Sequence, residues 1–77
     1  MTYKEFEREV KMLGATCRSY KAKSYLLYVL HHNILIATIP KTQSNCGDIF
    51  ITHILNDTDS KLLILCCELM QTPINER

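Results

Sequence analysis

The sequence predicts an α+β domain: an N-terminal helix, a three- to four-stranded antiparallel sheet and a C-terminal helix, in the order αβββ(β)α. Three observations predict it. Apolar residues recur at helical spacing near the start, and residues 16–39 are rich in β-branched and aromatic side chains. A long apolar stretch then follows good capping residues and ends at a proline. With 77 residues, the chain is expected to form one domain, residues 1–77.

The first helix is expected from about Thr2 to Leu13. Thr2 and Glu5 have the spacing of a capping box, in which a hydroxyl and a carboxylate satisfy free N–H groups at a helix start. Gly14 follows where a left-handed C-terminal stop is expected. The apolar stripe of this helix consists of Tyr3, Phe6, Val10 and Leu13.

Antiparallel strands are expected next, over 16–21, 24–31 and 34–39. The polar run Lys21–Ser24 marks the first reversal. His32 and Asn33 mark the second, because Asn, and less often His, tolerates the positive φ of a tight hairpin turn. Pro40 ends the third strand because it cannot donate to a ladder. The run Ile49–Ile51 is either a fourth strand or a buried loop anchor.

A two-residue turn at 32–33 sets the hairpin register, so that 31 faces 34, 29 faces 36 and 27 faces 38. One face of the sheet then carries Leu26, Tyr28, Leu30, Leu35, Ala37 and Ile39. The other carries Tyr25, Leu27, Val29, His31, Ile34, Ile36 and Thr38. Both faces are largely apolar, whereas a sheet with one wet face normally alternates. We therefore expect part of 41–57, a second protomer or another protein to cover the second face.

The second helix is expected from about Thr58 to Gln71. Asn56, Asp57 and Asp59 supply N-cap chemistry and acids for its first turn, and Pro73 ends it. The stripe expected to face the sheet is Leu62, Leu65, Cys66 and Leu69.

Further apolar residues lie outside that stripe. Helices that are apolar all round are usually buried on all sides, which predicts an oligomer or partner interface in so small a domain. A wide core stripe remains the alternative. The candidate protein interface comprises Leu27, Val29, Ile36, Leu63, Ile64, Cys67 and Met70.

The cysteines and histidines do not predict a metal or catalytic site. No pair has CxxC or HxxxH spacing, and adjacent cysteines on a helix diverge by about 100°. Nucleophile-elbow and Gly-rich phosphate motifs are absent. We therefore expect no catalytic residue, no metal, no cofactor and no enzyme, with cysteines acting as small buried hydrophobes. The residues weighed are Cys17, Cys46, Cys66, Cys67, His31, His32 and His53.

The charges are unevenly distributed although the net charge is only +1. Up to Lys41 there are seven Lys/Arg against three Glu, and from Thr42 onward two against five acids. The alternative function is therefore a weak nucleic-acid-binding module, in which cations meet phosphates and tyrosines stack on bases. It is not favoured, because dedicated binders are strongly basic. Its candidate residues are Arg18, Tyr20, Lys21, Lys23 and Tyr25.

The start of the chain, MTYKEFEREVKM, has no apolar core typical of a signal peptide. The apolar runs YLLYVL and LLILCC are far shorter than the roughly 20 residues that span a bilayer. We therefore expect a cytoplasmic protein with reduced thiols and no membrane partner.

The two ends of the chain and its hairpin together resemble a known group of proteins. Tyr3, Phe6, Val10, Leu13 and Gly14 open it, a hairpin ends in "IATIPK", and an apolar helix closes in "TPINER", Thr72–Arg77. This pattern resembles a largely uncharacterised family of small phage and prophage proteins of Gram-positive bacteria. The chain departs from that pattern in its Cys-rich final helix and in residues 45–47.

The resemblance implies a phage accessory protein in the cytoplasm of a bacterial host, and it carries over no catalytic residues. Together with the apolar surfaces, it leads us to expect a non-enzymatic protein that acts through protein–protein interaction. Host takeover and anti-defence are roles of this kind. The expected partner is a second copy of the chain or a host or phage protein.

Overall fold

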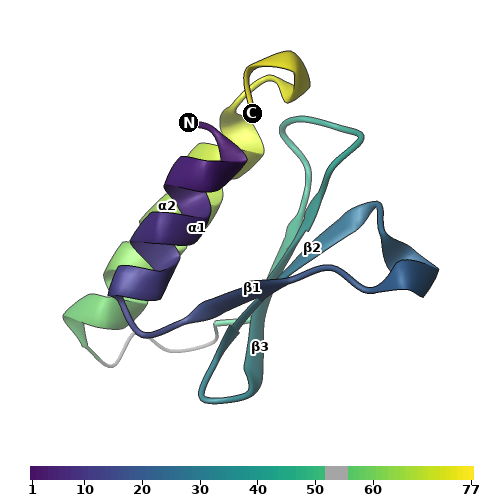
Figure 1. Ribbon diagram of the computed structural model, residues 1–77. Helices are drawn as coiled ribbons and strands as arrows, with labels where there is room; N and C mark the ends of the chain where they lie inside the picture. Colours follow the sequence, from purple (N-terminus) through teal and green to yellow (C-terminus); the bar gives the residue numbers. More distant parts are fainter. Residues whose placement is uncertain (52–55) are drawn as a thin grey trace.

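A computed structural model describes residues 1–51 and 56–77 and has the expected α+β architecture. The helices α1 and α2 lie side by side in one layer and cover one face of a single sheet (Figure 1). The sheet is antiparallel, with strand order β1-β2-β3-β4. The elements are α1 (Tyr3–Met12), β1 (Thr16–Arg18), the 3-10 turn η1 (Lys21–Lys23), β2 (Leu26–His31), β3 (Ile34–Pro40), β4 (Asp48–Ile49), α2 (Asp57–Gln71) and the 3-10 turn η2 (Ile74–Glu76).

The predicted start and stop of α1 are confirmed. Glu5 N donates to Thr2 Oγ1 at 3.1 Å, and Thr2 N donates to Glu5 Oε1 at 3.3 Å, which completes the capping box. The hydrogen bonds from the Thr2 backbone and side chain lower the pKa of the Glu5 carboxyl. Gly14 ends the helix at φ +82°, a conformation that glycine adopts without steric cost.

The hairpin turn between β2 and β3 is also confirmed, but most of its predicted register is wrong. His32 and Asn33 both have positive φ, 53° and 62°, as a primed two-residue turn requires. His31 faces Ile34 as predicted. From Val29 onward, the pairing is shifted by one residue, so that Val29 faces Ala37 and Leu27 faces Ile39.

The cause of the shift is a β-bulge at Ile36. Leu35 still faces Leu30, but the next pair is Ala37 with Val29, so Ile36 has no partner on β2. Its carbonyl instead accepts a hydrogen bond of 2.7 Å from Phe50 N, just after β4. Each residue beyond a one-residue bulge lies on the opposite face from the one that simple alternation gives.

The bulge therefore corrects the predicted sheet faces. Ala37 and Ile39 share a face with Leu27 and Val29, and all four are at most 3% exposed. Because this is the face that the helices cover, it forms the core. The helical side chains in that core include Phe6, Val10, Leu62, Cys66 and Leu69.

The boundary between the first two strands differs from the prediction of 16–21 and 24–31. β1 ends at Arg18 and β2 begins at Leu26, with η1 between them. Ser19 Oγ donates to Leu26 O at 3.3 Å, and Lys23 N donates to Tyr20 O at 3.0 Å. The connection is thus an ordered turn that extends away from the helices (Figure 1).

Of the two alternatives predicted for Ile49–Ile51, the structure has a strand, but a shorter one with other bounds: β4 covers Asp48–Ile49 and pairs Ile49 with Ala37 and Asp48 with Thr38. The N-cap of α2 is Asn56, whose Oδ1 accepts from Asp59 N at 3.0 Å. At the other end, Thr72 caps the helix in an extended conformation, as Pro73 requires of its predecessor.

Candidate functional site

An apolar groove lies between the C-terminal part of α1 and the first half of α2. Its apolar lining, here called the helical patch, consists of Met12, Leu13, Ile64 and Leu65. Met12 is 75% exposed and Ile64 is 57% exposed. One charged residue from each helix, Glu9 and Lys61, lines the same groove. Exposed apolar side chains that gather beside charged ones make this groove the candidate protein-binding site.

The structure separates the seven predicted interface residues into two groups. Leu27, Val29 and Ile36 are at most 6% exposed, and Met70 is 9% exposed, so these four belong to the core of this chain. The remaining three, Leu63, Ile64 and Cys67, are half-buried or exposed on α2.

Leu27 and Val29 lie on the sheet face that the helices cover, and Ile36, the bulged residue of β3, is buried in the same core cluster. Met70 is covered by residues 45–47: Asn45 N donates to Met70 O at 2.6 Å, and the side chain of Met70 lies against Gly47. Sequence periodicity could not show that this loop packs on the end of α2.

Met12 belongs to none of the surfaces predicted from the sequence. Its signal was a large apolar residue outside the Phe6–Val10 stripe at the end of an otherwise charged helix. Leu13 was assigned to the core stripe of the first helix. In the structure it is half-buried and belongs both to that stripe and to the helical patch.

The five candidate nucleic-acid-binding residues lie together on one exposed segment, here called the basic connection, residues 18–25. All five side chains are exposed, and its two tyrosines, Tyr20 and Tyr25, are 47% and 51% exposed. The rings of Tyr20 and Tyr28 form an edge-to-face pair with centroids 5.0 Å apart. The structure therefore places these residues together, and it adds Tyr28 to them.

The sheet face opposite the helices carries apolar side chains that are only half-buried: Leu26, Tyr28, Leu30 and Leu35. Residues 41–47 do not extend over this face but turn to the C-terminal end of α2, where Asn45 binds Met70. The helices lie on the other side (Figure 1). Among the described residues, this outer sheet face therefore remains open.

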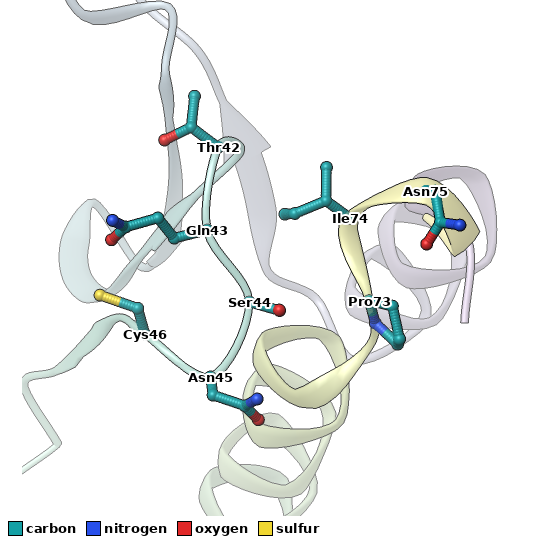
Figure 2. A pocket seen from close by; sticks show the side chains of 8 residues that line it. All are labelled: Thr42, Gln43, Ser44, Asn45, Cys46, Pro73, Ile74 and Asn75. Atoms are coloured by element: carbon teal, nitrogen blue, oxygen red, sulfur yellow. The ribbon is translucent and has the colours of Figure 1, made fainter.

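A polar cleft lies between the loop 42–46 and the turn 73–75. Figure 2 shows the side chains of Ser44 and Ile74 pointing into the space between these two segments, while Gln43 and Cys46 point away from it. The side chain of Arg77 donates to carbonyl oxygens on both segments or next to them, including Pro40 O and Thr72 O. Arg77 thus connects the two segments, and the lining of the cleft contains no Asp, Glu, His, Lys or Arg.

The four cysteines are free and lie in different environments. Burial is the main reason that the pKa of Cys17 and the pKa of Cys66 are raised from 9.0 to about 12. Such thiols are protonated at neutral pH and are poor nucleophiles and poor metal ligands. Cys46 is exposed, and Cys67 is half-buried.

The rings of His31 and His32 lie against each other at the hairpin turn, with centroids 4.1 Å apart. No group of three or more His, Cys, Asp or Glu side chains within residues 1–51 and 56–77 is arranged to hold a metal ion. His53, the third histidine weighed as a ligand or base, lies outside the described residues.

None of the helices in the described part of the chain is both long enough and apolar enough to cross a membrane. Comparisons of the chain with models of protein families, with curated proteins and with solved structures gave no significant match.

Proposed function

We propose that this chain is a non-enzymatic phage or prophage accessory protein that acts by binding another protein through the helical patch. The observation that carries this proposal is the joint exposure of Met12 (75%) and Ile64 (57%) on two neighbouring helices. Scattered single apolar residues are normal on a protein surface, but a group in one groove marks a site of interaction. The tail Thr72–Arg77 supports the phage origin through its resemblance to such proteins.

The charges of the groove make a second copy of the chain the first partner to test. Glu9 comes from α1 and Lys61 from α2, so each copy presents both signs beside the same apolar residues. Two copies can pack patch against patch, related by a two-fold axis that lies in the contact plane. With one orientation of this axis, Glu9 of each copy faces Lys61 of the other, and the apolar side chains of the two copies meet in the centre.

Sedimentation of three proteins over a range of concentrations tests this arrangement. The Met12→Asp/Ile64→Asp double variant places two carboxylates in the patch. Ile34→Asp is the matched control, since Ile34 is 69% exposed at the hairpin turn, away from the groove. We expect association of the wild type and the control, and a monomeric double variant whose far-ultraviolet circular dichroism is unchanged.

A monomeric wild type would exclude the second copy and leave a host or phage protein as the partner. The same three proteins are then used as baits in extracts of phage-infected Gram-positive cells. A protein retained by the wild type and by Ile34→Asp, and lost with the double variant, supports the proposal. Equal retention by all three baits would contradict it.

A further inference from the structure

We infer that the basic connection and the adjoining outer sheet face bind single-stranded nucleic acid. This inference goes beyond the proposed protein-binding function and uses a different surface of the molecule. Arg18, the last residue of β1, is the direct cross-strand neighbour of Tyr28 on β2. Directly paired residues of an antiparallel sheet lie on the same face, and Tyr28 is on the face opposite the buried Val29. A guanidinium and an aromatic ring therefore lie together on the open side of the sheet.

The next residues extend this combination of cations and rings. The ring of Tyr20 lies edge-on to the ring of Tyr28, at 80° to it. Lys21 and Lys23 follow on η1, with both side chains exposed. Tyr25 closes the segment, and its carbonyl accepts a hydrogen bond of 2.8 Å from Lys41 N. Both ends of the segment are thus fixed to the sheet, so the cations and rings have a defined relative arrangement.

The electrostatic surroundings favour a polyanion. The sequence contains no Asp or Glu between Val10 and Gly47, a range that includes the whole of β1, β2 and β3. The nearest acid of the sheet is Asp48 on β4, and β4 and β1 are the two opposite edges of the sheet. The acid that acts on β1 is Glu7 of α1, which, after burial, is the second cause that raises the pKa of Cys17, and it acts from the side that the helices cover. A phosphate chain on the open side of the basic connection would therefore meet the cations away from that carboxylate.

Single-stranded nucleic acid fits this surface better than other polyanions do. Its phosphates pair with cations, and its unstacked bases stack on exposed aromatic rings. A duplex keeps its bases stacked within the helix, and an acidic protein has no bases, so neither would use the rings in this way. Cations and tyrosines alternate along one segment and supply both kinds of contact: Arg18, Tyr20, Lys21, Lys23 and Tyr25.

Fluorescence anisotropy with labelled oligothymidylate, measured over a series of salt concentrations, tests the inference. Three phosphate contacts predict a slope of log affinity against log salt of about −2, because each contact on a single strand contributes about −0.7. Lys21→Ala/Lys23→Ala should reduce this slope to about −0.7. Lys4→Ala/Lys11→Ala, which removes the same charge from exposed positions of α1, should leave the slope unchanged.

A second variant separates stacking from charge. Tyr25→Ala should weaken binding of oligothymidylate about fivefold or more without changing the salt slope. Tyr25 is half-exposed and outside the core, so this variant is expected to fold. Binding of a duplex or of polyglutamate as tightly as the single strand, with no effect of Tyr25→Ala, would overturn the inference in favour of a general site for acidic partners. Absence of salt-dependent binding would overturn it altogether.

Discussion

Arg77 Nη1 donates a hydrogen bond of 2.7 Å to the carbonyl oxygen of Pro40, the last residue of β3. The same guanidinium donates from Nε to Thr72 O at 3.0 Å and from Nη2 to Met70 O at 3.1 Å. A helix leaves its last carbonyls without partners inside the helix, and a cation at that end also complements the helix dipole. One side chain therefore joins the end of α2 to the end of β3.

Replacing Arg77 by Ala should lower the free energy of unfolding by about 2 kcal/mol or more, because partly buried carbonyls lose charged donors. Arg77→Lys should lower it less, since an ammonium keeps the charge but cannot reproduce the planar set of donors. Urea denaturation measures both losses. Arg8→Ala, at an exposed position of α1, is the control and should change stability by less than about 0.5 kcal/mol.

Gly47→Ala should be more destabilising than Gly14→Ala, by about 1–3 kcal/mol. Both glycines have positive φ, so both substitutions strain the backbone. At Gly47, a Cβ would also lie 2.7 Å from Met70 Cε and 3.0 Å from Thr38 O, whereas Gly14 has no such neighbour within 4 Å.

A double-mutant cycle of Gly47→Ala with Met70→Ala separates the two contacts of the added Cβ. In the Met70→Ala protein, Gly47→Ala should no longer lose the stability that is due to the clash with the Met70 side chain, but it should still lose the stability that is due to the contact with Thr38 O. Thermal or urea unfolding of the four proteins gives the coupling. Equal losses for Gly14→Ala and Gly47→Ala would show that the loop moves aside.

Asn33→Gly should leave the stability unchanged or raise it slightly, whereas Asn33→Val should lower it by about 1–2 kcal/mol. Asn33 has φ 62°, which glycine adopts freely and which a β-branched residue adopts only with steric strain. Circular dichroism during thermal unfolding would rank the three proteins. A stable Asn33→Val protein would argue against the primed turn.

Cys46 should react with iodoacetamide in the folded protein long before Cys17 and Cys66 do. The latter two are shielded, and burial raises the pKa of each to about 12, so the reactive thiolate is scarce at neutral pH. Peptide mapping by mass spectrometry after timed labelling measures the order. Labelling of Cys66 as fast as Cys46 would indicate that the core opens locally.

The same two thiols predict a loss of stability at high pH. In the unfolded chain they ionise near 9.0, whereas in the folded protein they keep their protons until about 12. The folded state therefore binds more protons than the unfolded state between these values, and the free energy of unfolding should fall as pH rises from about 9 to about 12. A Cys17→Ala/Cys66→Ala protein should show a smaller fall in the same interval.

Features determined by neighbouring residues could be predicted from the sequence. The capping box of Thr2 and Glu5, the stop at Gly14 and the turn at His32-Asn33 depend on short-range chemistry, and all are confirmed. The order of helices and strands in the α+β fold follows from the order in which these local signals occur along the chain. The candidate cationic and aromatic residues of the basic connection were also found by pattern, because exposed side chains near each other in sequence remain near each other in space.

Features that depend on distant residues could not be predicted. The bulge at Ile36, whose carbonyl pairs with Phe50 after β4, reverses which side chains of β3 enter the core. Met70 was assigned to an interface because its cover, the segment around Gly47, is far from it in sequence. The tail residue Arg77 was interpreted only as a mark of origin, whereas its guanidinium donates to carbonyls at the end of β3 and at the end of α2.

The backbone at Arg77 has one more contact, since its carbonyl oxygen accepts a hydrogen bond of 3.2 Å from Tyr3 N in the first turn of α1. This contact joins residues at opposite ends of the sequence, so its loop-closure entropy is among the largest in the chain. It should form late in folding, after the hairpin and the helices, and should be among the first contacts to open. We therefore expect substitutions that remove this contact to change the rate of unfolding more than the rate of folding.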